Sequence, residues 1–331
     1  MAKNLSNYTQ VLLRGAGQVM FQNNAWCGLL FIAGIVWGAC SAHQWAVAVG
    51  ALAGLAAATL TGRMLRLPAS DGEQGLWGFN GILVGCAMPT FLGNSVGMWV
   101  ALVLCAALTT WVRTGLNNVM QQWRINSLTF PFVLCTWLFL LAARALHSLP
   151  PVGMSVPSLP GPFTGAHGAI TFGELAECWL RGISQVFLID SWVTGALFLA
   201  GLAVSNLRAA VWAAIGSAAA LAAAFAFGGA AADISHGLYG FSPVLTAIAL
   251  ATVFYKPGWR SAAWALTGIL VTFFVQAGMN VLLSPVGLAT LTAPFCITTW
   301  LFLLPLIRLD DNAARPDHSD WDRRRKRHLR S

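Results

Sequence analysis

The sequence predicts an all-α polytopic membrane protein with ten transmembrane helices, arranged as two inverted repeats of five helices. Three observations predict this fold class: an apolar composition, ten apolar runs with a regular charge pattern, and an internal repeat. Of the 331 residues, 57% are hydrophobic and 9% are charged, whereas about a quarter of the residues are charged in a typical soluble domain. The fifteen tryptophans also agree with a membrane setting, because the indole ring favours the membrane–water boundary.

Each predicted helix is an apolar run close to the length of about twenty residues that a bilayer core requires. In the first half these runs cover residues 25–42, 45–61, 79–95, 97–113 and 130–147. In the second half they cover residues 186–204, 208–228, 241–255, 260–281 and 294–308. The sequence thus divides into a first membrane repeat (1–147), an external linker (148–172), a second, inverted repeat (173–308) and a basic cytoplasmic tail (309–331).

The positions of lysine and arginine agree with this count, because these residues collect in cytoplasmic loops. With Lys3 inside, basic residues fall at every second connection, at Arg63, Arg66, Arg113, Arg124, Arg208, Lys256, Arg260 and Arg308. Only Arg144 and Arg181 fall on the opposite side. The pattern predicts a multi-pass protein of the cell (inner) membrane with both termini cytoplasmic. The terminal "RRRKRHLRS" then indicates an anchor near anionic lipid rather than a nucleic-acid site.

Four blocks of sequence occur twice and in the same order. "LRGAGQVMF" from Leu13 returns as "LRGISQVFL" from Leu180, and "GLLFIAGI" from Gly28 returns as "GALFLAGL" from Gly195. "GLWGFN" from Gly75 returns as "GLYGFS" from Gly237, and "LTFPFVLCTWLFL" from Leu128 returns as "LTAPFCITTWLFL" from Leu291. The shared order and the nearly constant spacing between copies indicate a duplication. Since five spans is an odd number, the second copy lies inverted, and the two copies meet near the bilayer midplane.

Gln18 and Gln185 occupy the same position in the first repeated block. The block precedes the five full runs of each half, so we expect a tilted, re-entrant half-helix that enters the membrane without crossing it. Each glutamine either bonds a neighbouring helix or lines a pathway, and the pairing across an axis favours the pathway. If the half-helices direct their N-termini at this pathway, their positive dipole ends oppose cations. Arg14 and Arg181 are interpreted as anchors to headgroups or to carbonyl ends.

Thr129 and Thr292 share the motif "LTxPF", in which a proline follows two residues after the threonine. Proline interrupts the regular hydrogen-bond ladder at a helix start. Non-helical backbone at membrane depth requires protein or a water-filled cavity around it. The two hydroxyl groups therefore either face a polar solute or cap their helices, and both roles are compatible.

Phe79 and Phe241 follow matching glycines, and Leu83 and Leu245 come four residues later. This spacing places each Phe–Leu pair on one helix face. Packing against lipid or core is the alternative for any single ring. The repetition and the flanking glycines favour an aromatic constriction.

The sequence lacks the residue sets that catalysis or a cofactor requires. It contains no GxxxxGK[ST] phosphate loop, no CxxC or HxxxH spacing and no nucleophile–base set. The seven cysteines are interpreted as buried free thiols. Ion-coupled carriers bury carboxylates or histidines along the path, whereas the acidic residues here fall in predicted loops or at segment edges. We therefore expect no enzyme activity, no metal and no cofactor, and a path for a small neutral polar solute.

With these residues the sequence resembles the urea transporter family. "LRGxxQV", the "GFN"-type block and "LTxPF", each present twice, carry the resemblance over residues 10–310. It implies one central pore per subunit between two inverted halves, a homotrimer, and passive, channel-like transport of urea. Carried over by motif, Gln18, Gln185, Thr129 and Thr292 contribute to polar ladders in the pore. Phe79 with Leu83 and Phe241 with Leu245 shape flat slots, joined by Val19 and Val186.

Two departures and several alternatives accompany this resemblance. Some relatives carry a glutamate in place of one half-helix glutamine, and Ser242 stands where the first copy has Asn80. The alternatives are a channel for other small neutral solutes, such as short amides, polyols, ammonia or water, and a membrane subunit without transport activity. The twin histidines of an ammonium channel and the "NPA" repeats of aquaporin-like pores are not apparent in the sequence.

Overall fold

A computed structural model of the chain describes residues 2–161, 171–307 and 309, and its regular structure in these ranges is helical throughout. Four segments are long and apolar enough to cross a membrane: α3 (Trp45–Met64), α6 with its 3₁₀ extension (Val96–Trp123), α10 (Leu207–Ala226) and α13 with its 3₁₀ extension (Trp259–Val286). The consecutive helices α8 and α9 count as a fifth if their bend of 73° lies within one broken span.

Five further apolar helices are shorter: α2 (Ala25–Ser41), α5 (Phe79–Phe91), α7 (Phe130–Ala143), α12 with its π-helical end (Phe241–Val253) and α14 (Ala293–Leu303). The remaining helices are α1 (Ala2–Gln18), α4 (Ala69–Glu73), α8 (Phe172–Ser184), α9 (Trp192–Ser205) and α11 (Ala231–Ser235). These elements form an all-helical, apolar assembly. The arrangement as ten separate spans in two inverted halves stays a prediction.

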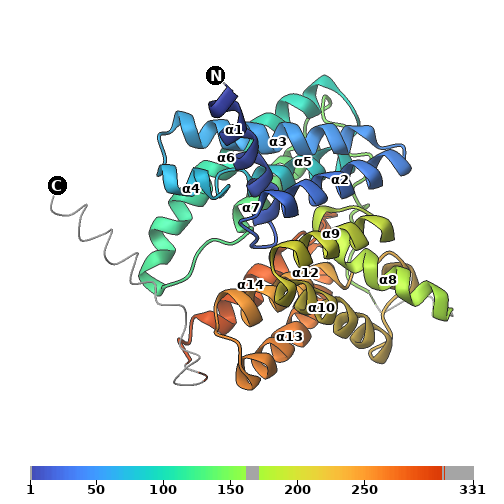
Figure 1. Ribbon diagram of the computed structural model, residues 1–331. Helices are drawn as coiled ribbons and strands as arrows, with labels where there is room; N and C mark the ends of the chain where they lie inside the picture. The colour runs from blue at the N-terminus through green and yellow to red at the C-terminus, as the bar shows by residue number, and fades with distance from the viewer. Residues whose placement is uncertain (1, 162–170, 308, 310–331) are drawn as a thin grey trace.

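The two series of helices, α1–α7 and α8–α14, are similar in the order of their lengths. The fourth helix of each series has five residues, and the sixth has 25 residues and ends in a three-residue 3₁₀ turn. In Figure 1, α1–α6 lie on one side of the molecule, and α10 and α12–α14 lie on the other. The boundary between the two series follows α2 and α9.

Backbone turns recur at matching positions of the repeated blocks. Phe21 (φ 62°) and Leu188 (φ 58°) end the first block in each half, and Leu128 (φ 51°) and Leu291 (φ 50°) open the "LTxPF" block. Leucine and phenylalanine rarely adopt a positive φ. These residues reverse the chain ahead of the helices that follow, so each helix enters at a defined angle.

Reciprocal contacts join α2 to α9. A β-carbon on Gly34 would come within 2.8 Å of the Phe198 ring, and one on Gly201 would come within 3.0 Å of the Phe31 ring. Gly34 and Gly201 match in the repeat, as do Phe31 and Phe198. Small residues of this kind allow close helix approach in membranes. Each glycine therefore accepts the aromatic ring of the opposite series.

Several expected boundaries differ from the observed ones. The run expected at 186–204 begins as helix only at Trp192, because a 3₁₀ turn (Gln185–Phe187) and Leu188 turn the chain first and Ser191 then caps α9. The run expected at 97–113 continues as α6 to Met120, although Thr114, Gly115 and Asn117 are weak helix formers, so the helix extends beyond the apolar pattern on which the expectation depended. The short helices α4 and α11 lack the long apolar pattern on which the prediction depended.

The expected linker and tail lie partly outside the described residues. Residues 148–161 contain no helix, as expected of a linker, whereas residues 162–170, 308 and 310–331 are not described. Arg144 is one of the two arginines that the predicted topology does not place on the cytoplasmic side. Its Nη2 donates hydrogen bonds to the carbonyl oxygens of Ser155 (2.9 Å) and Gly287 (3.2 Å). Its charge is therefore satisfied by backbone carbonyl groups.

Candidate solute pathway

The hydroxyl groups of Thr129 and Thr292 meet in the interior. Their Oγ1 atoms lie 2.7 Å apart, and each residue is only 2% exposed. Thr129 Oγ1 also lies 3.3 Å from Cys296 Sγ. Both threonines occupy N-cap positions, of α7 and α14, yet neither side chain caps its own helix. Of the two roles that the sequence left open, side-chain capping is wrong, and the hydroxyl groups are available to each other or to a solute.

Asn80 takes over the capping of α7. Its Oδ1 accepts a hydrogen bond from the backbone N–H of Phe132 (3.2 Å), the third helical residue after Thr129. Asn80 lies in α5 and is 1% exposed. Ser242, at the matching position in α12, is also buried, and its Oγ has no hydrogen-bond partner. The shorter serine therefore does not reproduce the role of Asn80, a relationship that "GFN" and "GFS" alone could not reveal.

Gln18 and Gln185 make equivalent contacts. Gln18 Nε2 donates to the Gln74 carbonyl oxygen, and Gln185 Nε2 donates to the His236 carbonyl oxygen, each at 2.9 Å. Gln18 is the last residue of α1, and Gln185 directly follows α8. A pathway lined by these glutamines would therefore face the carboxyl ends of α1 and α8, and not the N-termini named in the conditional expectation. N-termini reach the centre from α7 and α14 instead.

Arginines brace both glutamine-bearing turns. Arg14 Nη1 donates to the Glu73 carbonyl oxygen and Arg181 Nη1 to the Ser235 carbonyl oxygen, each at 2.9 Å. The interpretation of these arginines as anchors to carbonyl groups is thus confirmed. Arg181 also contacts Glu177 (3.0 Å).

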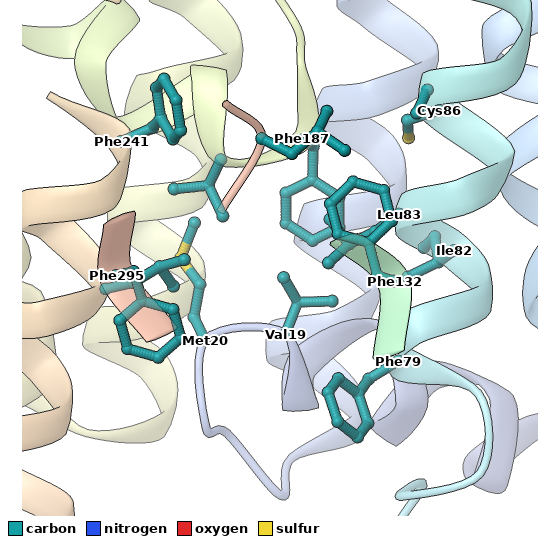
Figure 2. Packing of buried hydrophobic residues seen from close by; sticks show 14 of the residues in the cluster. Val19, Met20, Phe79, Ile82, Leu83, Cys86, Phe132, Phe187, Phe241 and Phe295 are labelled. Atoms are coloured by element: carbon teal, nitrogen blue, oxygen red, sulfur yellow. The ribbon is translucent and has the colours of Figure 1, made fainter. Parts of the chain in front are cut away.

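The apolar candidates are buried in the interior. Phe79 and Phe241 are 7% and 9% exposed, and the other four are nearly or fully buried: Leu83, Leu245, Val19 and Val186. Figure 2 shows Phe79 and Phe241 at opposite ends of this cluster, with Val19 and Leu83 between them. Burial argues against contact of these two rings with lipid, whereas packing in the hydrophobic core remains an alternative to an aromatic constriction.

Comparison with known proteins decides the relationship of this chain. A model of the urea transporter family matches residues 9–307. The chain belongs to the urea transporter family. Urea transporter 1 of Rattus norvegicus is 30% identical over 303 residues, which cover 88% of this chain and 76% of that protein. The proteins of the same name from Mus musculus and Ovis aries are 29% and 28% identical with the same coverage.

Among the described residues no group of three or more His, Cys, Asp or Glu side chains could hold a metal ion. The seven cysteines are free thiols, and six of them are buried. A urea transporter is a membrane channel and not an enzyme.

One charged pair in this urea transporter family member escaped sequence reasoning. Arg113 was expected at the cytoplasmic end of a run, but it lies within α6 with its side chain 9% exposed. Its Nη2 lies 3.2 Å from Asp71 Oδ2, and its guanidinium carbon lies 5.9 Å from the centre of the Phe79 ring. In the sequence Arg113 served only as a marker of a cytoplasmic loop, and this pair could not be predicted, because only the fold brings Asp71 of α4 to Arg113 of α6.

Proposed function

We propose that the chain conducts urea passively through a pore between two inverted halves of five helices, with Thr129 and Thr292 at its middle. The observation that carries this proposal is the 2.7 Å contact between the two hydroxyl groups. They belong to matching positions of the two sequence copies. Two copies of one residue meet where a twofold axis passes, and inverted repeats locate the solute site at such an interface.

A second pair of contacts supports the same axis. Trp137 Nε1 donates to the Ala289 carbonyl oxygen, and Trp300 Nε1 donates to the Asn126 carbonyl oxygen, each at 2.9 Å. Trp137 matches Trp300, and Asn126 matches Ala289, when the two copies are aligned on their "LTxPF" blocks. Each half thus donates to the other in the same way, as expected of an isologous contact.

The chemistry of the proposed path suits urea. Urea is planar and carries four N–H donors and one carbonyl acceptor. Removing the water from such an amide without replacement costs about 2–7 kcal/mol. The hydroxyl oxygens of Thr129 and Thr292 and the Oε1 acceptors of Gln18 and Gln185 supply replacement hydrogen bonds. Since no full charge is offered by these groups, urea is held weakly enough to leave.

Phe79 and Phe241, with Leu83 and Leu245, are proposed to form the flat slots on the two sides of the threonine pair, joined by Val19 and Val186. A slot between apolar walls admits a planar solute and leaves no room for its hydration shell. Selectivity then follows from shape at the rings and from hydrogen bonding at the oxygens.

The proposed setting is the cell (inner) membrane, with both termini cytoplasmic and three subunits, each with its own pore. Large exposed apolar side chains support lipid contact, among them Trp26, Leu60, Trp111, Leu266 and Phe274. The trimer is proposed from the resemblance to the family, and native mass spectrometry of the protein in detergent tests it.

Urea uptake into proteoliposomes tests the function. We expect [¹⁴C]urea to equilibrate faster than in protein-free liposomes, without ATP and without an ion gradient. Uptake of formamide and swelling in response to water permeation, measured in parallel, examine the alternative solutes. If no small solute crosses faster than in empty liposomes, the transport assignment fails and a subunit without transport activity is favoured.

A further inference from the structure

Shape alone does not separate urea from the guanidinium cation. Both are planar and have three substituents around one carbon, and guanidinium offers N–H donors in every direction. The oxygens and aromatic slots of the proposed pore would accept these donors, and aromatic faces attract cations. A path for urea with these components therefore requires a charge-based filter.

We propose that Arg113 is this filter, a specificity-determining residue that excludes planar cations from the Phe79 slot. The inference depends on the proposed pore. The guanidinium carbon of Arg113 lies 5.9 Å from the Phe79 ring centre. Arg113 therefore already makes the cation–π contact that this ring could otherwise offer to a cationic solute. A second cation approaching the same ring meets a like charge at close range.

The ion pair with Asp71 does not cancel this field. The Arg113 side chain is 9% exposed, whereas the Asp71 side chain is 23% exposed. Because the Asp71 carboxylate is more exposed, water screens its negative charge more strongly than the buried positive charge of Arg113. The buried end of the pair is therefore positive, and it is the end that lies over Phe79.

At the position that matches Arg113, the second half carries a neutral amide. Gln276, which matches Arg113 between α6 and α13, is 1% exposed and donates from Nε2 to the Leu238 carbonyl oxygen. Its Oε1 is buried without a hydrogen-bond partner. Asp233 matches Asp71, so the acidic position is retained while the guanidinium is not. The filter is thus one-sided and lies on the Phe79 side of the pore.

Uptake into proteoliposomes reconstituted with the full chain tests whether Arg113 excludes planar cations. Uptake of [¹⁴C]guanidinium and [¹⁴C]urea is measured side by side, with the membrane potential clamped at zero by equal K⁺ and valinomycin. In wild type we expect guanidinium to enter at less than about a tenth of the urea rate. The double variant Asp71→Asn/Arg113→Gln gives both positions neutral side chains and avoids a buried unpaired charge. Its guanidinium-to-urea ratio is expected to rise about tenfold or more.

The variant Arg113→Lys separates charge from packing. It keeps a cation beside Asp71, so we expect it to retain a ratio close to that of wild type. A ratio in Arg113→Lys as high as in the double variant would overturn the proposal. An unchanged ratio in the double variant would also overturn it, and so would free guanidinium passage in wild type, which requires no variant to fold. Absence of urea uptake by wild type contradicts the proposed function instead.

Discussion

Two threonine hydroxyl groups at N-cap positions show how single residues acquire a role from their neighbours. An N-cap threonine normally satisfies the first free N–H groups of its helix. In α7 the side chain of Asn80 satisfies one of these groups, so the hydroxyl of Thr129 is free to meet that of Thr292. A buried amide on another helix thus caps the helix that begins after Thr129.

Replacing Thr129 or Thr292 by valine is expected to slow urea flux by about three- to tenfold. The loss of one hydroxyl group removes a neutral hydrogen bond of about 1 kcal/mol from the passing solute. Initial rates in proteoliposomes measure the effect. Thr267→Val, on the exposed face of α13 where the hydroxyl bonds only the Ala263 carbonyl oxygen, is the matched control. Full wild-type flux in both pore variants would remove threonine from the mechanism.

Asn80→Ala is expected to destabilise the protein, whereas Ser242→Ala is not. The first change removes the hydrogen bond to the Phe132 N–H, and loss of such a cap costs about 1 kcal/mol. The second removes a buried hydroxyl without a partner. Thermal unfolding of both variants in the same detergent provides the comparison. Equal melting temperatures would show that the cap contributes nothing.

At the scale of elements, glycines set how closely α1 and α8 approach the helices that follow them. A β-carbon on Gly28 would overlap the Leu13 carbonyl oxygen, and one on Gly195 would overlap the Leu180 carbonyl oxygen. The first helix of each series therefore lies directly on the backbone of the second. This contact fixes the direction from which the glutamine-bearing ends of α1 and α8 arrive.

Gly28→Ala is expected to lower the melting temperature and the urea flux together, because α1 must move away from α2 to accommodate the methyl group. Gly115→Ala, in α6, is the control, since a β-carbon there meets nothing within 4 Å. Alanine in an open helical position is favoured by about 1 kcal/mol over glycine, so this control is expected to match or exceed wild-type stability. A loss of stability in both variants alike would contradict the role of close approach.

At the scale of the whole molecule, several contacts between the two series of helices recur with the roles exchanged. Gly34 receives Phe198 while Gly201 receives Phe31, and the two tryptophans donate crosswise to backbone carbonyl oxygens. Charges depart from this symmetry, because Arg113 matches Gln276. The proposed pore would therefore have related shapes but different electrostatic character on its two sides.

Cysteine labelling tests the proposed topology of the whole chain. Cys40, at the end of α2, is exposed, and the other six cysteines are buried. With both termini cytoplasmic, Cys40 lies outside, and a membrane-impermeant maleimide is expected to label it in intact cells. Lys256→Cys in a Cys40→Ser background, at an exposed connection after α12, is expected to react only in opened membranes. The reverse pattern would invert the topology.

The sequence by itself determined the membrane class and the family, and it selected the paired threonines, glutamines and phenylalanines. Apolar runs and repeated motifs are local or periodic signals, so they can be recognised without knowing which helices touch. Only the tertiary structure decided that Thr129 meets Thr292, that Asn80 caps α7 and that Arg113 is buried over Phe79. Those outcomes depend on contacts between residues far apart in the chain, where packing selects one partner among many of the same chemical type.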